Sequence, residues 1–312
     1  LVGSEMCIRD RDNFYTISEF ERENAIQAFG FTDLGIEAYV SPVGGMGPMA
    51  FSSLIGMAGL GASPDTGNLK HHEEAAFAIP GIGLPLRFSH QYNSRAVYYP
   101  DELKSMGPGW THDYSSCIRP SGDLLYVAWA NGALHPYQIT GPSTAECLVQ
   151  GVYDEMTLET ADRIRIRKKN QISYLFERPA AGYPFMLAEI ADRNGNALTC
   201  TYETTGLRRL VQVTGPAGRT LALDYHTTSG METLLHTVTD PAGRQVRYDY
   251  DAATHDLTTY VDPEGNTTTY HYDPEQPHEH QLRTVQLPDG TTVDNTYADR
   301  RIAAQRLSLI HI

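Results

Sequence analysis

A glycine-containing turn followed by a tyrosine seven residues after the glycine occurs five times in the C-terminal part of the chain. The pairs are Gly195/Tyr202, Gly218/Tyr225, Gly243/Tyr250, Gly265/Tyr272 and Gly290/Tyr297. Subtraction of the residue numbers places successive glycines 23, 25, 22 and 25 residues apart. A fixed short period indicates that one supersecondary unit is copied and stacked. The repeat therefore favours a structural or enclosing role over a single catalytic centre.

Each unit has the sequence pattern of a β-hairpin. Residues 240–243 (Asp-Pro-Ala-Gly) and 262–265 (Asp-Pro-Glu-Gly) fit a type I turn, because Asp can cap the first position, Pro presets φ at the second and Gly suits the fourth. The segments 244–250 and 266–272 that follow are rich in Thr, Val and Tyr, as strands are. A return strand is then expected from Leu257.

The tyrosines of these strands are expected to lie in the interior. By the two-residue period of a strand, Tyr248 and Tyr250 share one face, as do Tyr270 and Tyr272. One hairpin cannot bury this aromatic face alone, so its neighbours must cover it. Stacked hairpins then form a long, curved, continuous sheet, and we expect the tyrosines of residues 202–297 to be mostly buried. An open, solvent-facing row would instead indicate a surface for glycans or partner proteins.

The chain upstream of the repeats also reads as strands and turns. Alternation through 84–92 places five side chains on one strand face, those of Leu84, Leu86, Phe88, His90 and Tyr92. Further strands are expected at 124–129, 164–167 and 172–176, with turns at 120–123, 131–132 and 193–195. No helix longer than about ten residues is expected after residue 66. These patterns predict an all-β protein.

The N-terminal segment, residues 12–64, reads differently. A short helix is expected around 19–29, where glutamates open the segment and Gly30 closes it. Residues 38–63 carry no charge and are long enough to span a bilayer. Two prolines and six glycines in this run weaken a helix, however. A buried or plug-like coil is the preferred interpretation, and membrane insertion is the alternative.

Both ends of the chain match one short oligonucleotide. Residues 5–11 back-translate to GAG ATG TGT ATA AGA GAC AG, and the reverse complement of most of that stretch encodes Leu-Ser-Leu-Ile-His-Ile, the sequence of 307–312. This inverted pair resembles the transposon end used in preparing sequencing libraries, so residues 1–11 and 307–312 are excluded from fold reasoning. We expect the natural protein to continue beyond both ends. A sheet that stopped here would expose an edge near 292–297 and associate with rising concentration.

Composition argues against some partners and sites. Without those ends the chain has 22 basic and 36 acidic residues, from 24 − 2 and 38 − 2, so the formal net charge stays at −14. A nucleic-acid-binding protein presents a basic face, so no nucleic-acid partner is expected. The three remaining cysteines, Cys117, Cys147 and Cys200, are far apart and odd in number, which argues against a disulfide framework or a CxxC metal site.

Few motifs suggest chemistry. The segments 71–74 (His-His-Glu-Glu) and 278–280 (His-Glu-His) contain metal-ligand residue types, but neither has the helical His-x-x-x-His spacing, and solvated polar loops are preferred. Cys117 has no identifiable histidine partner and reads as a small buried apolar residue. Residues 107–110 (Gly-Pro-Gly-Trp) predict a tight turn that delivers Trp110 into the core. We expect no catalytic residue, cofactor or metal, and a structural role for the repeat glycines and tyrosines.

The turn, strand and tyrosine pattern, with Tyr-Asp at 250–251 and 272–273, resembles the Tyr-Asp (YD) repeat of Rhs (rearrangement hotspot) proteins. Four upstream phrases resemble the block that precedes those repeats: Asp-Thr-Gly-Asn-Leu at 65–69, Gly-Leu-Pro-Leu at 83–86, Tyr-Asn-Ser-Arg at 92–95 and Gly-Pro-Gly-Trp-Thr-His at 107–112. The resemblance predicts a β-rich block at 65–188 and about five YD repeats at 189–306. Three of the five units lack Asp directly after the tyrosine, as degenerate repeats commonly do.

The resemblance implies a hollow β shell, a strand spiralled into a cocoon that sequesters a variable C-terminal toxin. In that family the parent protein is exported by a bacterium, often through a contact-dependent apparatus such as type VI secretion, and an aspartyl autoproteolytic site near the end of the shell frees the toxin. The Asp-Pro pairs at 240–241 and 262–263 are repeat turns and do not take that protease role. The expected partners are the remaining repeats, the toxin and secretion-apparatus proteins. The alternative is a cell-surface adhesin that binds glycan or protein through a Tyr-rich sheet.

Overall fold

The computed structural model describes residues 7–9, 14–16, 60–62, 68–72, 75–94, 96–98, 104–298 and 301–308. Within these ranges the chain is built from β-strands, and its helical segments are two 3-10 turns, η2 (Ala96–Tyr98) and η4 (Pro277–Glu279). The expected all-β class is confirmed. The helix expected at 19–29 and most of the run 38–63 lie outside the described residues. In the described part, no helix is long and apolar enough to cross a membrane.

Strands β9 to β16 form a closed ring. Each pairs antiparallel with the next in the chain, and β16 returns to β9, where Phe185 and Met186 lie opposite Ile118 and Cys117. The strands are β9 (Cys117–Ser121), β10 (Leu124–Ala128), β11 (Leu134–Ile139), β12 (Thr144–Cys147), β13 (Glu155–Thr160), β14 (Arg163–Arg167), β15 (Ser173–Glu177) and β16 (Phe185–Ala191).

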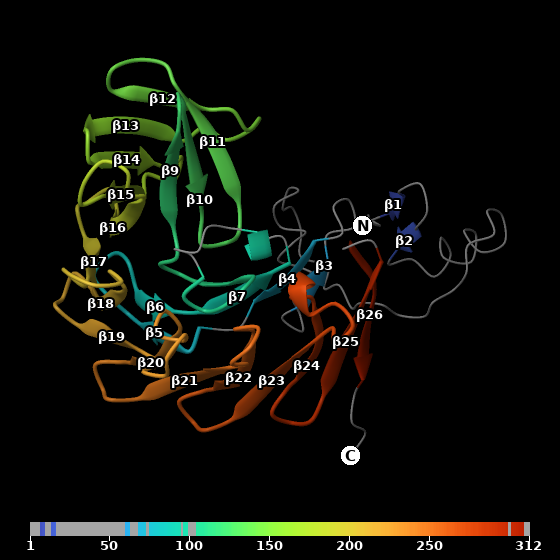
Figure 1. Cartoon of the computed structure of the whole chain (residues 1–312). Coiled ribbons are helices and arrows are strands. Elements are labelled where there is room, and N and C mark those ends of the chain that lie inside the picture. Colours follow the sequence, from blue (N-terminus) through green and yellow to red (C-terminus); the bar gives the residue numbers. More distant parts are fainter. Residues whose placement is uncertain are drawn as a thin grey trace, which may run out of the picture.

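A curved sheet continues from this ring. β16 also pairs with β17, and each strand from β17 to β26 pairs antiparallel with the next. The resulting arc sweeps away from the ring (Figure 1). Its strands are β17 (Ala197–Tyr202), β18 (Leu210–Thr214), β19 (Thr220–Tyr225), β20 (Leu235–Thr239), β21 (Gln245–Tyr250), β22 (Leu257–Val261), β23 (Thr267–Tyr272), β24 (Leu282–Gln286), β25 (Thr292–Ala298) and β26 (Arg301–Ser308).

Every repeat turn uses its glycine for a positive φ. The angles are 84°, 73°, 82°, 88° and 83° at Gly195, Gly218, Gly243, Gly265 and Gly290. Each of these glycines donates its backbone N–H to the carbonyl three residues earlier. The turns therefore close as the sequence predicts for glycine at the fourth position.

Aspartate at the first turn position caps the turn. In Asp192, Asp240 and Asp262, one carboxylate oxygen accepts the backbone N–H groups two and four residues later, at 2.8–2.9 Å. Hydrogen bonds lower the pKa of Asp192, and the bond from the Asn196 side chain has the largest effect. Gly215 stands at this position in the second unit, so that turn has no carboxylate cap.

The repeat tyrosines make a hydrogen bond that is the same in all five units. Each hydroxyl donates to the carbonyl of a leucine fifteen residues earlier, at 2.8–3.0 Å. A shift in strand register falls immediately before each tyrosine. Such bulges re-aim a side chain, here back across the preceding strand. The bonds are Tyr202–Leu187, Tyr225–Leu210, Tyr250–Leu235, Tyr272–Leu257 and Tyr297–Leu282.

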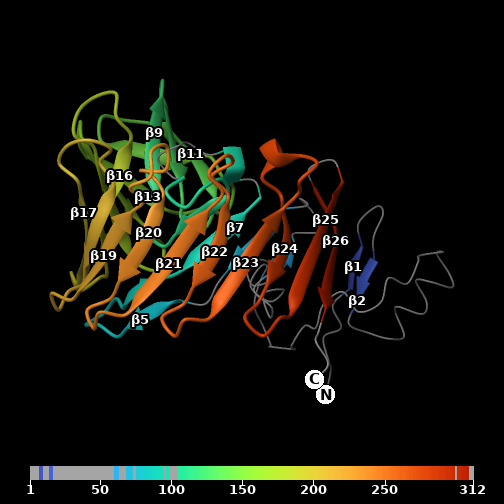
Figure 2. The same ribbon diagram turned by 60° about the horizontal axis from the view of Figure 1, so that its bottom comes forward.

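The upstream strands lie inside the arc. A four-stranded sheet has the order β3-β4-β7-β8, and β5 pairs with β6. Both views place β5 and β7 against the inner side of the row of repeat strands (Figures 1 and 2). These elements are β3 (Leu60–Ala62), β4 (Leu69–His72), β5 (Phe77–Ile79), β6 (Leu86–Phe88), β7 (His90–Asn93) and β8 (Trp110–His112).

The alternation predicted through 84–92 is confirmed. Four of its five alternating side chains are buried, and that of Leu84 is half-buried. The segment is split between β6 and β7, which belong to different sheets, and Ser89 separates them. The reason is local: both the backbone N–H and the hydroxyl of Ser89 donate to the carboxylate of Asp113, at 2.7 and 2.8 Å, so this N–H takes no part in a strand ladder.

Other sequence expectations agree closely with the strands. The segments 124–129, 164–167 and 172–176 correspond to β10, β14 and β15 to within one residue at each end. Turns form at 131–132 and 193–195. The turn expected at 120–123 is shorter, because residues 120 and 121 still pair with β10.

The end of the repeat sheet differs from the expectation of an exposed edge near 292–297. β25 is paired along its length with β26, so β26 is the edge of the described sheet. The last two residues of β26, Leu307 and Ser308, belong to the stretch attributed to the library oligonucleotide, yet they pair opposite Val293 and Thr292. β1 (Cys7–Arg9), which belongs to the excluded N-terminal stretch, pairs with β2 (Phe14–Thr16), which follows that stretch.

Candidate functional site

The upstream strands meet the repeat sheet in a buried set of rings, which we call the inner aromatic cluster. Neighbouring ring centroids in it are 4.6–5.9 Å apart. Such pairs stabilise by about 0.5–1.5 kcal/mol each beyond their area burial. The cluster therefore joins two parts of the chain that are far apart in sequence. Its members are His71, His90 and Trp110 from the upstream strands and Tyr248, Tyr260 and Tyr270 from the repeats.

Hydrogen bonds orient the rings across this contact. Trp110 donates its indole N–H to the hydroxyl of Tyr272 at 2.7 Å. The two ring nitrogens of His90 lie 3.2 Å from the Tyr270 hydroxyl and 3.4 Å from the Tyr248 hydroxyl. Buried polar groups need such partners, so the position of the upstream strands against the repeats is specified by hydrogen bonds as well as by shape.

Tyr92 extends the contact to the last units. Its hydroxyl donates to the carbonyl of His280 at 2.7 Å and accepts the backbone N–H of Leu282 at 3.3 Å. Leu282 is the first residue of β24 and also receives the Tyr297 hydroxyl on its carbonyl. One upstream side chain is thus joined to the start of a repeat strand.

The turn predicted at 107–110 is confirmed. Gly107 and Gly109 have φ of 82° and 78°, and Trp110 is 1% exposed. A Cβ on Gly107 would overlap the carbonyl oxygen of His255 in the loop between β21 and β22. Glycine is therefore required twice over, by its φ and by the close approach of a repeat loop.

A second contact joins the turn between β5 and β6 to the repeat turns. A Cβ on Gly83 would overlap the carboxylate of Asp192, which caps the first repeat turn. Arg219, just after the second repeat turn, donates a hydrogen bond to the carbonyl of Pro80. The upstream block is thus attached to the repeat sheet at its turn edge as well as on its inner face.

Burial shifts the pKa of several side chains in this interior toward the neutral form. Burial raises the pKa of Tyr225, Tyr250 and Tyr272 above the ordinary tyrosine value. Burial lowers the pKa of His112 to about 3. The Nδ1 atom of His112 accepts the backbone N–H of Tyr114 at 3.2 Å, which requires a neutral imidazole.

The two histidine-rich segments named in the sequence are not brought together as one site. His71 is buried in the inner aromatic cluster, while residues 73–74 lie outside the described ranges. The expectation of an exposed loop at 278–280 is only partly confirmed. His278 is exposed, but His280 is half-buried and pairs with Asp256 at 2.9 Å. His280 therefore serves a contact between repeat loops.

Cys117, Cys147 and Cys200 form no disulfide in the part of the chain that the structure describes. Cys117 is 0% exposed, as expected of a small buried apolar residue. Burial raises the pKa of Cys200 to about 12, so its thiol stays protonated.

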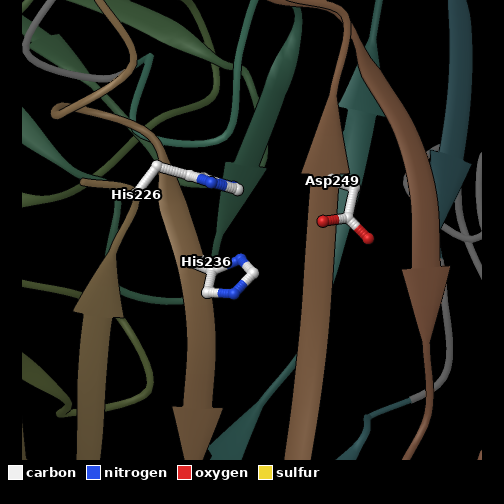
Figure 3. Close-up of side chains that lie close together, drawn as sticks. All are labelled: His226, His236 and Asp249. Carbon is white, nitrogen blue, oxygen red and sulfur yellow. The ribbon is translucent and has the colours of Figure 1, made fainter. Parts of the chain in front are cut away.

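One polar cluster was missed by sequence reasoning. His226, His236 and Asp249 are all half-buried and each offers a ligand atom, these atoms lying within 4.8 Å of one another. They come from the residue after β19, from β20 and from β21, and their side chains gather in the gap between neighbouring strands (Figure 3). Imidazole nitrogen and carboxylate oxygen are ligands for Zn²⁺ and related ions.

The sequence held a signal for this cluster. His226 follows the repeat tyrosine Tyr225, where the YD pattern has Asp. His236 follows Leu235, the first residue of a return strand, and Asp249 precedes the next repeat tyrosine. All three positions are defined by the repeat, but joining them requires the strand register.

One family model matches a part of the chain upstream of the repeats. A family model described as a domain of unknown function, DUF6531, matches residues 63–137, a range that includes β4 to β10. The comparison with curated proteins gives no significant match.

Three solved structures show distant likeness. The crystal structure of TcdB2-TccC3 has 13% identity and a TM-score of 0.39 over 86% of this chain, which spans only 18% of that chain. The N-terminal domain of effector protein SpvB from Salmonella typhimurium strain LT2 has 12% identity and a TM-score of 0.32, over 77% of this chain and 100% of that one. A porin-like protein from Bacteroides uniformis has 10% identity and a TM-score of 0.26, over 79% and 99%.

Proposed function

We propose that this chain is part of the wall of an Rhs-type shell that encloses a C-terminal toxin domain. One observation carries the proposal: the inner face of the repeat sheet packs against polypeptide from another part of the same chain. An enclosing protein needs a wall whose concave side can hold polypeptide.

Burial of the repeat tyrosines supports an inward-facing role. Tyr248, Tyr250, Tyr260 and Tyr270 are 0–9% exposed. The other repeat tyrosines are half-buried, with their hydroxyls bonded to backbone carbonyls; they are Tyr202, Tyr225, Tyr272 and Tyr297. One continuous apolar core runs from Leu69 to Val293 and includes both the ring and the arc. All eight tyrosines of residues 202–297 are therefore buried or half-buried, so the expected burial is met in full by four of them and in part by the other four.

The opposite face of the sheet is polar. In the ring, Arg165 lies 2.6 Å from Glu159 and 3.3 Å from Glu189, and Arg163 lies 3.0 Å from Glu177. In the arc, the residues that alternate with the inward ones include Thr, Asp, Arg and His. A sheet with one packed face and one solvated face suits a wall in water. The adhesin alternative needs a free row of tyrosines, and the described repeats have none.

The proposal extends to the parent protein. The shell segment acts by packing and needs no catalytic residue of its own. Its partners are the remaining repeats, the toxin domain and proteins of a secretion apparatus, and the parent is exported from a bacterium. These points rest on the resemblance of the YD repeats and of the four upstream phrases to the Rhs family.

The sequence of the uninterrupted gene tests the proposal directly. Genomic DNA should be recovered on the 3′ side of codon 306 and read to the stop codon. We expect many more YD repeats followed by an unrelated terminal domain. An anchoring signal directly after the repeats, with no such domain, would overturn the proposal.

Protease protection of the full parent protein provides a second test. The terminal domain should resist trypsin while the shell is folded and become sensitive when the shell is unfolded by urea. The matched control is the terminal domain expressed alone. Equal sensitivity of the attached and isolated domains in native buffer would mean that the shell does not enclose it.

A further inference from the structure

From the geometry of His226, His236 and Asp249, we propose that these residues form a Zn²⁺ site that links two neighbouring repeat hairpins. His226 and His236 belong to the hairpin of β19 and β20, and Asp249 belongs to the next hairpin. An ion held by all three would join the hairpins at a place where their strand ladder has ended.

The strand ladder leaves the space for this site. The register of β20 and β21 runs from Thr239 opposite Gln245 to Thr237 opposite Arg247. One residue beyond it, the carbonyl of Tyr248 accepts ring N–H groups from both histidines, at 3.1 Å from His226 and 3.3 Å from His236. Two imidazoles thus occupy the place of the next ladder bond.

These two hydrogen bonds prepare the rings to bind a metal. A carbonyl can only accept, so Nε2 of His226 and Nδ1 of His236 carry the protons. In each neutral ring the other nitrogen, Nδ1 of His226 and Nε2 of His236, has a free lone pair. Metal-binding histidines usually donate the N–H of their second ring nitrogen to a carbonyl or carboxylate in this way, which sets the tautomer and the ring orientation.

The distances allow an ion with small side-chain movements. Tetrahedral Zn²⁺ bonds of about 2.1 Å place ligand atoms roughly 3.4 Å apart. One ligand atom of each residue lies within 4.8 Å of those of the other two, and the two imidazole centroids are 4.3 Å apart. The carboxylate of Asp249 faces the histidines from the neighbouring strand (Figure 3). We infer that rotation of the three side chains brings the lone-pair nitrogens and the carboxylate together on one ion.

A divalent ion meets little competition for the carboxylate of Asp249. The competing contact on Asp249 is weak, because Arg247 lies 3.2 Å away with a side chain that is 53% exposed. Surface pairs of this kind are worth about 0–1 kcal/mol, so a divalent ion can displace the guanidinium.

Among the described residues, the other units do not repeat the cluster. The residues after their tyrosines act in their own loops: Asp251 caps the turn at Ala253 and Thr254, and Glu203 pairs with Arg209. A histidine at this position cannot cap in the same way, and His226 instead contacts the next hairpin. Three protein ligands leave a fourth position open to water, as in many zinc sites.

Zinc titration of the full chain, freed of metal by a chelator and carrying no histidine tag, tests the proposal. We expect one tightly bound Zn²⁺ per chain, competing with a chromophoric chelator, and a thermal midpoint that rises with zinc concentration. His236→Gln and Asp249→Asn should each weaken binding by more than the roughly 10–100-fold that loss of an outer hydrogen-bond partner causes.

Matched controls separate this site from other histidines. Asp224→Asn changes an exposed carboxylate at the same repeat position as Asp249, and His278→Gln changes the exposed histidine of the 278–280 loop. Both should retain the zinc affinity of the parent chain. No tight binding, or tight binding that survives His236→Gln and Asp249→Asn, would overturn the proposal.

Cobalt(II) gives a second readout that does not depend on stability. Substitution at a four-coordinate site of this composition should give intense visible absorption, because tetrahedral geometry is distinguished from octahedral by its spectrum. The absorption should be absent in His236→Gln at the same cobalt concentration. An unfolding transition of this variant, measured without metal, checks that the variant is folded. A weak, octahedral spectrum unchanged by His236→Gln would contradict the site.

Discussion

The hydroxyl of Tyr272 receives the indole N–H of Trp110 at 2.7 Å and donates its own hydrogen to the carbonyl of Leu257 at 2.8 Å. One upstream side chain is therefore joined to the hydrogen bond that recurs in the repeats. Tyr225 makes the corresponding bond to Leu210 at 3.0 Å. The two tyrosines make it possible to separate what stabilises a repeat from what attaches the upstream block.

Tyr272→Phe should destabilise the chain more than Tyr225→Phe. Each loses the recurring bond and leaves a leucine carbonyl without its hydroxyl donor, which costs about 1–3 kcal/mol. Tyr272→Phe also removes the acceptor of the Trp110 N–H, so we expect its effect to be about 1 kcal/mol larger. Urea unfolding of both variants measures the difference. Equal effects would show that the Trp110 bond contributes nothing net.

A double-mutant cycle isolates the contact itself. Trp110→Phe alone, Tyr272→Phe alone and the double variant should give a coupling energy of roughly 0.5–1.5 kcal/mol. Tyr153→Phe, which changes an exposed loop tyrosine, serves as the control and should lie within about 0.5 kcal/mol of the parent.

Gly107 and Gly243 have the same φ of 82° but different surroundings. A Cβ on Gly243 meets nothing within 4 Å, whereas one on Gly107 overlaps the carbonyl oxygen of His255. Gly243→Ala should cost about 1–2 kcal/mol for the left-handed backbone alone. Gly107→Ala should cost roughly 1–3 kcal/mol more, because it separates the upstream loop from the repeat loop. Equal losses in urea unfolding would mean that the backbone relaxes around the added methyl.

Turn capping can be tested in both directions. Asp240→Ala removes the acceptor of the Ala242 and Arg244 backbone N–H groups and should destabilise by about 1–3 kcal/mol. Gly215→Asp introduces the same cap into the second unit, where a Cβ makes only ordinary contacts of 3.6 Å or longer. We expect it to stabilise by roughly 0.5–1 kcal/mol.

The Asp240 cap also predicts a pH dependence. Burial opposes the shift, but hydrogen bonds from the Arg244 side chain and the turn backbone lower the pKa of Asp240. A lowered carboxylate pKa contributes stability above the unfolded value of 3.8 that is lost as pH falls through the folded value. The advantage of the parent over Asp240→Ala should therefore shrink in acid below about pH 4. A constant advantage would contradict the role of the ionised carboxylate.

His112 predicts a loss of stability at mildly acid pH. Its pKa is about 3 in the folded protein against 6.5 as the ordinary value, so below 6.5 the unfolded chain binds more protons. Stability from this residue is complete above pH 6.5 and is lost progressively as pH falls toward 3, by up to about 2 kcal/mol between pH 7 and pH 5. His112→Asn keeps an acceptor near the Nδ1 position and removes the titration. Unfolding at both pH values should show a smaller acid loss in the variant; an equal loss would assign the effect to other groups.

Much of the repeat unit could be predicted from the sequence because its determinants are adjacent residues. The Asp-Pro-x-Gly turn formed at 240–243 with the expected cap and glycine angle. The strand expected at 244–250 is β21, which begins at Gln245. The edge expected at 292–297 was wrong, because β26 (Arg301–Ser308) pairs along β25 and covers it.

Sequence by itself determined the hairpin, its period and the inward face of its tyrosines, because a turn type, a two-residue strand period and a stacking repeat are local properties. Tertiary structure decided where those elements meet. Only the curvature of the sheet brings Trp110 to Tyr272, residues 162 apart in the chain. Only strand register places His226 and His236 beside Asp249. Contacts between distant segments depend on how every intervening strand twists and pairs, and no short stretch of sequence contains that information.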